Sequence, residues 1–144
     1  MTDAPLPQRG DFSVLRPIPT RWMDVDVYGH VNNVEYYSYF DTAVNGWLVE
    51  TGLLDPETSP VFGVVAETQC QFLAELKFPE IIEAGISVTR LGSKSVTYRI
   101  ALFKPGHADP AALGRFVHVY VDRVTRQSVP VPATVRAGLE PLIR

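Results

Sequence analysis

The stretch Asp24-Val25-Asp26-Val27-Tyr28-Gly29-His30-Val31-Asn32-Asn33 stands directly before a run of residues with helical periodicity. It gathers two carboxylates, one imidazole and two amides around a glycine, and no other part of the chain concentrates polar chemistry in this way. Because a helix N-terminus offers free N–H donors and a favourable dipole, polar groups beside it are well placed to stabilise developing negative charge. We call this stretch the 24–33 segment, and both the fold prediction and the candidate site start from it.

A helix is predicted over residues 34–50, directly after the 24–33 segment. Asn32 or Asn33 can cap it, and with Asn32 as the cap Glu35 takes the third helical position, as in a capping box. Gly52 supplies the stop signal. The apolar stripe of this helix is broad and aromatic, and it comprises Tyr36, Tyr37, Phe40, Ala43, Val44, Trp47 and Leu48. So wide a stripe favours a helix that lies along a sheet, with most of these aromatic side chains in the core.

Strand patterns flank the predicted helix on both sides. Residues 12–18, interrupted by two prolines, indicate a short or edge strand. After Gly52 the hydrophobic period changes to two and predicts four strands, at residues 62–72, 86–91, 96–103 and 115–123. In the first of these four, one face is expected to carry Phe62, Val64, Ala66, Thr68, Cys70 and Phe72. Turns are expected at residues 77–80, 92–93 and 104–110, and a short final helix within 131–143.

This order of one strand, one long helix and four strands predicts an α+β fold in which a curved antiparallel sheet wraps around the helix. A length of 144 residues suits one domain. The sheet would keep an open edge, which favours association of several copies of the chain.

The composition is that of an ordinary soluble protein, with 46% hydrophobic and 20% charged residues. A net charge of -3 argues against a general nucleic-acid binder, and no apolar run approaches the ~20 residues of a membrane span. Cys70 is the single cysteine, so no intramolecular disulfide forms, which suits the reducing cytoplasm. We expect Cys70 to be a small core residue, and residues 1–10 to form a loose polar tail and no signal peptide.

The 24–33 segment, together with Tyr36 and Tyr39-Phe40, resembles the signature of the hotdog-fold acyl-CoA thioesterases, above all the 4-hydroxybenzoyl-CoA thioesterase-like family. Weaker similarity at residues 71–79, 89–95 and 119–122 extends the resemblance over most of the chain. The resemblance implies a hotdog fold and hydrolysis of an acyl-CoA thioester to a free carboxylic acid and CoA. It implies no metal and no cofactor beyond the CoA of the substrate, and a homo-oligomer of two or four subunits.

The resemblance also implies residue roles within the segment. Asp26 matches the catalytic carboxylate, which either attacks the thioester carbonyl or activates a water molecule. The backbone N–H of Asn33 matches the oxyanion donor, and Gly29 lets the chain approach the substrate closely. His30 matches a histidine of the acyl-carrier-protein thioesterases, where a structural histidine is the alternative. Those enzymes carry an asparagine where this chain has Tyr28, so their Asp–Asn–His mechanism does not transfer intact.

We also expect roles for residues that do not belong to the predicted catalytic group. Tyr36 is expected to bind the acyl group. The resemblance implies that Arg90 and Lys94, on either side of the 92–93 turn, contact the phosphates of CoA at a site completed across a subunit interface; for each lysine or arginine named here, the alternative is a solvated surface role. Asp24 is expected to be structural, holding the turn or pairing with Arg21. Arg115, Arg123 and Arg126 are further candidate phosphate contacts, and Glu67 is a second candidate carboxylate.

Four other interpretations compete with thioester hydrolysis. The segment also fits a plain strand-to-helix corner, because Asp, Gly and Asn form turns. It partly matches a calcium-binding EF-hand loop, although Tyr28 stands at a ligand position and prolines preclude an entering helix. A non-catalytic acyl-CoA-binding or sensing domain would have no need for the Asp26 carboxylate. A hotdog dehydratase would need a different arrangement of histidine and acid.

Overall fold

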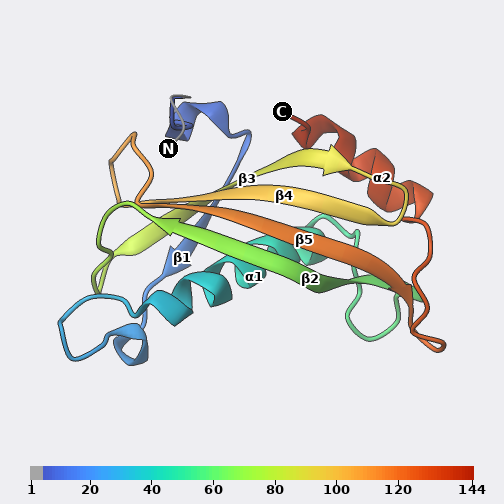
Figure 1. Ribbon diagram of the computed structural model, residues 1–144, viewed down its shortest axis with the longest axis horizontal. Helices are drawn as coiled ribbons and strands as arrows, with labels where there is room; N and C mark the ends of the chain where they lie inside the picture. The colour runs from blue at the N-terminus through green and yellow to red at the C-terminus, as the bar shows by residue number, and fades with distance from the viewer. Residues whose placement is uncertain (1–4) are drawn as a thin grey trace.

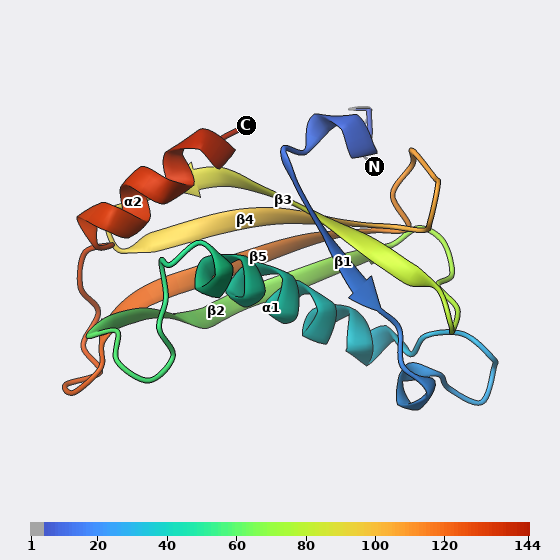
Figure 2. The same cartoon turned by 180° about the vertical axis from the view of Figure 1, so that it is seen from behind.

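The computed structural model describes residues 5–144, and Figure 1 shows a five-stranded antiparallel sheet that curves around one long helix. The elements are β1 (Val14–Pro19), α1 (Asn33–Glu50), β2 (Val61–Phe72), β3 (Ile81–Leu91), β4 (Ser95–Phe103), β5 (Ala112–Asp122) and α2 (Ala133–Leu139). The strand order is β1-β3-β4-β5-β2. Seen from behind in Figure 2, α1 crosses the concave side of the sheet. The predicted α+β architecture of a hotdog fold is therefore confirmed.

Helix α1 begins one residue earlier than predicted because Asn32 is its N-cap. The Asn32 Oδ1 accepts the Val34 N–H at 3.2 Å. The expected capping box does not close, since the Asn32 N–H already donates to the Asp24 carbonyl at 2.9 Å. The Glu35 carboxylate lies instead 3.5 Å from the Arg21 guanidinium. The cap thus ties the start of the helix to the segment before it.

The main core lies between α1 and the concave face of the sheet. The buried residues of α1 are Tyr36, Tyr39, Phe40, Ala43, Val44 and Leu48, which confirms the aromatic stripe as core. Phe40 comes closest to the sheet at Gly114, where a Cβ would lie 2.4 Å from the phenyl ring. A glycine at this position of β5 therefore sets how deeply the helix can seat on the sheet.

The expected face of β2 is wrong for its first half, because a β-bulge interrupts the strand at Ala66. Residues directly opposite each other in an antiparallel pair share a face. Val65 pairs with His118 and Thr68 pairs with Phe116, so Val65 and Thr68, three residues apart, face the same way. One extra residue in the strand produces this reversal. Phe62 and Val64 consequently lie on the convex face, opposite Thr68, Cys70 and Phe72.

Two strands, β3 and β5, begin well before their predicted ranges. β3 begins at Ile81, five residues before the prediction, because Ile81 and Ile82 pair with the end of β1. β5 begins at Ala112, and its small residues up to Gly114 pair with β4. Alanine and glycine have weak strand propensity, so tertiary pairing decides these boundaries.

The N-terminal segment is not the loose tail that was expected, at least from Arg9 onward. Residues 9–11 form a 3₁₀ turn, and the Arg9 N–H donates to the Ala108 carbonyl at 2.9 Å. Phe12 lies outside β1 and packs on the convex face of the sheet, 5.9 Å from the Phe103 ring centroid. The part of the expected tail at residues 1–4 lies outside the described residues.

The C-terminal helix is confirmed as α2, with Pro132 as its N-cap and a 3₁₀ turn at Glu140–Leu142. Its Val135 and Leu139 join the main core. Within residues 5–144, no helix is both long and apolar enough to cross a membrane.

Candidate active site

The 24–33 segment folds as a tight corner between a 3₁₀ turn at Trp22–Asp24 and the start of α1. The Asp26 N–H donates to the His30 carbonyl at 3.1 Å, and the Gly29 N–H donates to the Asp26 carbonyl at 3.2 Å. Gly29 has a φ of 87°, a left-handed conformation that glycine adopts without the strain of a side chain. The corner therefore folds back so that residues 26 and 30 lie side by side.

Asp24 is the structural carboxylate of the corner, as predicted. Its side chain is fully buried, and Oδ1 accepts from the Arg21 guanidinium at 2.8 Å. Its Oδ2 accepts from the Tyr39 hydroxyl at 2.7 Å and from the Arg21 N–H at 2.9 Å. Burial alone would raise the pKa of Asp24, but the hydrogen bonds from Arg21 and Tyr39 hold it below its usual value. Because both oxygens are engaged in the core, Asp24 is not the calcium ligand of an EF-hand loop.

Asp26 faces the other way and is half-buried. Its Oδ1 accepts the Tyr28 N–H at 2.8 Å, which closes an Asx turn. Within residues 5–144 its Oδ2 has no hydrogen-bond partner. One oxygen thus holds the carboxylate in place and the other is free to act on a bound molecule.

A cavity of about 390 Å³ opens at this corner. Four residues that the sequence singled out line it together: Asp26, His30, Asn33 and Tyr36. The opposite wall comes from the end of β2 and the turn after it, with Phe72, Leu73, Ala74 and Glu75. The cavity therefore lies between the N-terminus of α1 and the C-terminal end of β2.

The backbone N–H of Asn33 is free to donate to a ligand. The Val34 N–H donates to the Asn32 side chain and the Glu35 N–H donates to the Asn32 carbonyl at 3.0 Å. Among the described residues, no acceptor takes the Asn33 N–H. Since Asn33 lines the cavity, this donor and the dipole of α1 are available to an anionic group there.

Tyr36 and His30 each have a neighbour on the opposite wall of the cavity. The Tyr36 and Phe72 rings make an edge-to-face contact with centroids 4.9 Å apart. Burial raises the pKa of Tyr36, so its hydroxyl stays neutral. The His30 Nε2 lies 3.6 Å from the Glu75 carboxylate. Glu75 and Leu73 were not predicted as site residues, because the residues after a predicted strand carry no periodicity that indicates a site.

Arg90 and Lys94 do not line the cavity of their own chain. They flank the β3–β4 turn, whereas the cavity borders Phe72 of β2, and Figure 1 shows the two places at opposite ends of the sheet. Along β4, Val96 pairs with Leu91 beside the β3–β4 turn, and Leu102 pairs with Ala112 at the end of the sheet that holds the cavity. The six-residue separation between Val96 and Leu102 corresponds to about 20 Å. Gly29 shapes the corner but does not line the cavity.

The remaining candidates lie elsewhere. Glu67 forms an ion pair with Arg115 on the convex face and is not a second carboxylate of the cavity. Arg123 and Arg126 stack on the Phe62 ring, with guanidinium carbons 4.9 and 5.2 Å from its centroid. Cys70 packs against the core as expected, and burial raises the pKa of its thiol to about 11, so it is a weak nucleophile.

A long helix wrapped by an antiparallel sheet, with a carboxylate and a free helix amide sharing a cavity, defines a hotdog protein with a site at the N-terminus of its helix. The sequence model of the Thioesterase-like superfamily matches residues 20–139. The chain belongs to this superfamily.

Known relatives agree with the assignment. The crystal structure of the PA5185 protein from Pseudomonas aeruginosa strain PAO1 is 47% identical, with a TM-score of 0.92 over 96% of this chain and 97% of that chain. The gentisyl-coenzyme A thioesterase BH1999 is 26% identical, with a TM-score of 0.75 over 85% of this chain and 99% of that chain. The YsmA protein of Bacillus subtilis (strain 168) is 25% identical over 118 residues, 82% of this chain and 79% of that protein. Family and neighbours together support thioester hydrolysis as the general activity.

Proposed function

We propose that this protein hydrolyses an acyl-CoA thioester to a free carboxylic acid and CoA. The observation that carries the proposal is the shared cavity of the Asp26 carboxylate and the Asn33 N–H. Thioester hydrolysis needs a base or nucleophile on one side of a carbonyl carbon and a donor for the oxyanion that forms. The cavity offers one of each, on rigid supports.

The reaction would start with the thioester oxygen accepting the Asn33 N–H. In one route Asp26 takes a proton from a water molecule whose oxygen attacks the carbonyl carbon, and the collapsing intermediate expels the CoA thiolate, which receives that proton. In the other route the Asp26 Oδ2 attacks the carbonyl carbon and the CoA thiolate leaves. Water then hydrolyses the mixed anhydride to the carboxylic acid and the Asp26 carboxylate, and the proton that this releases passes to the thiolate. A single oxyanion donor contributes ~10²–10³ to the rate of such reactions. Both routes are complete with carboxylate, amide and water, so we propose that no cofactor takes part.

His30 supports this chemistry as a positioning group. It lines the same cavity as Asp26 and stands beside the Glu75 carboxylate. A histidine held in this way can orient the attacking water toward Asp26. Tyr36 and Phe72, in contact with each other, would form the apolar floor that receives the acyl group.

The binding of the CoA phosphates is the reason to propose an oligomer. Arg90 and Lys94 lie about 20 Å from the cavity of their own chain, so we propose that they reach the CoA phosphates bound at the cavity of a neighbouring subunit. β2 supplies a surface for that neighbour, because among residues 5–144 it pairs with β5 alone and leaves its other 12-residue edge open. The cytoplasm is the proposed location, since a lone cysteine suits a reducing compartment.

Asp26→Asn tests the assignment directly. The amide keeps an acceptor for the Tyr28 N–H but has no basic or nucleophilic oxygen. We expect the variant to lose at least ~100-fold in kcat/KM against the best substrate of a panel of short, long and aromatic acyl-CoAs, measured as release of free thiol.

The matched control is Asp55→Asn, which alters an aspartate with a similar turn role, since Asp55 Oδ1 accepts the Glu57 N–H at 2.9 Å. Asp55 does not line the cavity, so its variant should keep wild-type turnover. Equal rates for Asp26→Asn and the wild type would show that Asp26 is not the catalytic group. Tight acyl-CoA binding without thiol release by the wild type would favour the non-catalytic binding domain.

A further inference from the structure

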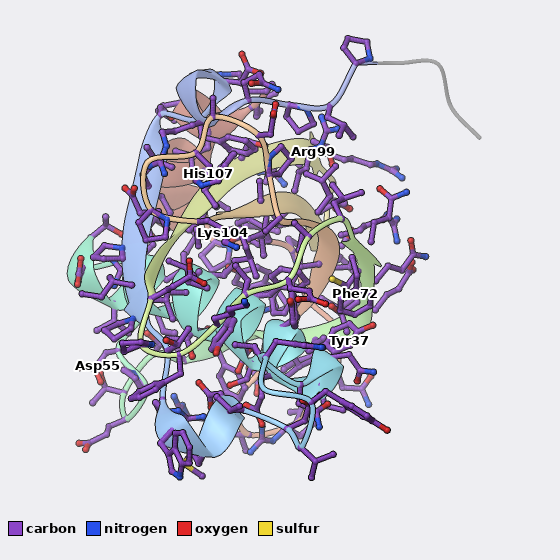
Figure 3. The ribbon with its side chains drawn as sticks, turned by 90° about the vertical axis from the view of Figure 1, so that its left-hand side faces the viewer. Tyr37, Asp55, Phe72, Arg99, Lys104 and His107 are labelled. Atoms are coloured by element: carbon purple, nitrogen blue, oxygen red, sulfur yellow. The ribbon has the colours of Figure 1, made fainter. Side chains whose placement is uncertain are left out.

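The convex face of the sheet, the face turned away from α1, carries a row of polar residues across four strands. Ser87 of β3 pairs with Arg99 of β4, Arg99 pairs with Arg115 of β5, and Arg115 pairs with Gln69 of β2. In Figure 3 the sheet arches over α1, with Arg99 outside the arch and Tyr37 of α1 on the other side. None of these residues takes part in the candidate active site.

Two arginines directly opposite each other in neighbouring strands repel one another unless an anion compensates them. Glu67 compensates Arg115 through an ion pair. Arg99 is exposed and has no acidic side chain within ion-pair distance among residues 5–144, and only its backbone is held in the middle of the sheet. The arrangement leaves one uncompensated positive charge available to an anion from outside.

Arg99 borders a cavity of about 660 Å³ between the convex face and the N-terminal segment. Its apolar wall includes Leu6, Pro7 and Phe12, and its polar wall includes Ser13, Ser87 and Arg144 together with Arg99. Asp11 also lines it, but its Oδ2 is occupied by the Gln8 N–H at 2.8 Å. One side of the cavity is thus apolar and the other carries two guanidinium groups.

The roof of this cavity is anchored to the rest of the molecule. Arg9 forms an ion pair with Glu83 and donates to the Lys104 carbonyl at 3.2 Å, and the Gln8 side chain donates to Asp109 at 2.8 Å. Phe12 packs over Gly85, in a small second core with Ala101, Phe103 and Leu113. These contacts hold the N-terminal segment above the sheet, so the cavity is a fixed feature of the fold.

We infer that this convex-face cavity binds an amphiphilic oxyanion, that is, a carboxylate or phosphate carried on an apolar body. The oxyanion would accept chiefly from the Arg99 guanidinium and the Ser87 hydroxyl, and the apolar body would lie along Leu6, Pro7 and Phe12. Arg144 would add a second positive charge, although its Nη1 already donates to the Pro141 and Ile143 carbonyls. Arginine is suited to this task because its planar fork donates two parallel hydrogen bonds to either oxyanion. The inference is independent of thioester hydrolysis, because no residue of the active-site cavity takes part.

Titration of the full-length protein followed by amide NMR tests the inference with four probes: octanoate, octyl phosphate, octanol and inorganic phosphate. We expect both amphiphilic anions to shift the Ser13, Ser87 and Arg99 signals and to bind at least ~10-fold more tightly than octanol or phosphate. Tighter binding of octanoate identifies the natural ligand as a carboxylic acid, and tighter binding of octyl phosphate identifies it as a phosphate ester. Shifts confined to Asn33 and Tyr36 would place the ligand in the active-site cavity and overturn the inference.

Two substitutions test the two halves of the site separately. Arg99→Gln should weaken both amphiphilic anions ~10–100-fold, whereas Arg126→Gln, which removes the same charge from an exposed loop, should leave binding unchanged. Leu6→Ser, at a position 43% exposed and therefore safe for folding, should weaken the octyl compounds and leave inorganic phosphate unchanged. Wild-type affinity in both Arg99→Gln and Leu6→Ser would refute the site.

Discussion

Asp24 and Asp26 are separated by one residue, and the alternation of the chain at the corner sends their side chains in opposite directions. The Asp24 carboxylate accepts hydrogen bonds from Arg21 and Tyr39 inside the protein, and the Asp26 carboxylate lines the cavity. The contacts of Asp24 fix the start of α1 to the corner, and thereby fix Asp26 relative to the Asn33 N–H. The Asp24 carboxylate therefore has a structural role, and the Asp26 carboxylate is left for the proposed chemistry.

Removing the Asp24 carboxylate should cost stability. Asp24→Ala leaves the Tyr39 hydroxyl without its acceptor in the core and the Arg21 guanidinium without its closest carboxylate. Because Arg21 is partly exposed, we expect a loss of about 3 kcal/mol in the free energy of unfolding, the lower end of the range for a buried ion pair. Tyr39→Phe removes one hydrogen bond and should cost about 1 kcal/mol.

Urea unfolding at neutral pH measures both losses. Asp26→Asn is the control, because it keeps the acceptor for the Tyr28 N–H and should unfold close to the wild type. Equal stability of Asp24→Ala and the control would mean that the buried carboxylate does not hold the corner.

At the scale of the element, β5 carries an aromatic cluster on its concave face in which one member is a histidine. His118 is 1% exposed, and its ring contacts those of Tyr98 and Phe116 with centroids 5.7 and 5.0 Å apart. Its Nδ1 has no hydrogen-bond partner within the described residues. Burial without a partner disfavours the charged ring and lowers the pKa of His118 to about 4.

This histidine should make stability depend on pH. Its folded pKa of about 4 lies below an unfolded value of about 6.5, so between these values the unfolded chain binds more protons. Stability is therefore fully present above about pH 6.5 and is lost as the pH falls toward 4, by up to about 3 kcal/mol.

Urea unfolding of the wild type and of His118→Phe at pH 7.0 and pH 5.0 checks this expectation. Phenylalanine fills a similar volume beside Tyr98 and Phe116 and does not titrate, so its variant should lose much less stability between the two pH values. Identical pH dependence in the two proteins would assign the effect to other groups.

The sequence predicts the elements well where local signals are strong. The end of α1 and the turn at residues 92–93 follow from periodicity and from glycine, both of which act within a few residues. The bulge at Ala66 and the early start of β3 were missed, because they depend on pairing with β5 and β1 across the fold. A single bulge was enough to reverse the predicted face of Phe62 and Val64.

The residues of the candidate site were also predicted where they are close in sequence and missed where the fold brings them together. Asp26, His30, Asn33 and Tyr36 lie close together in the sequence, and their shared cavity could be predicted from the motif. Glu75 and Leu73 come from a turn that only the sheet brings to the same place. The separation of Arg90 from the cavity follows from the antiparallel topology, which puts the β3–β4 turn at the far end of the sheet.

At the scale of the whole molecule, charge is divided between the two parts of the chain. Nine of the thirteen Lys and Arg residues follow residue 84, and only three of the sixteen acidic residues do. The later part of the chain supplies most of β3, all of β4 and β5, and α2. Although the whole chain has a net charge of -3, the part after residue 84 has an excess of six basic residues, nine against three acidic ones, which suits CoA phosphates at the β3–β4 turn and an oxyanion at Arg99.

The open edge of β2 provides the last prediction. Val64 and Val65 of this strand are 38% and 47% exposed, beside main-chain groups for which the described part of the chain supplies no partner strand. An open strand edge of this kind pairs with another chain unless charge or proline blocks it. We expect the wild type to sediment as a dimer or a larger assembly and Val65→Lys to shift it toward the monomer, because a lysine at the edge opposes strand pairing.

Sedimentation velocity and acyl-CoA kinetics on the same samples separate the interface from the chemistry. If Arg90 and Lys94 serve the neighbouring subunit, Val65→Lys should raise KM for acyl-CoA as the assembly dissociates, since the phosphates lose their cations. Val124→Lys is the matched control, because it introduces the same charge at a valine that is 87% exposed in the loop after β5 and lies outside β2. A wild type that is monomeric and fully active would instead show that one chain holds the whole site, and the CoA phosphates would then need cations near Asp26.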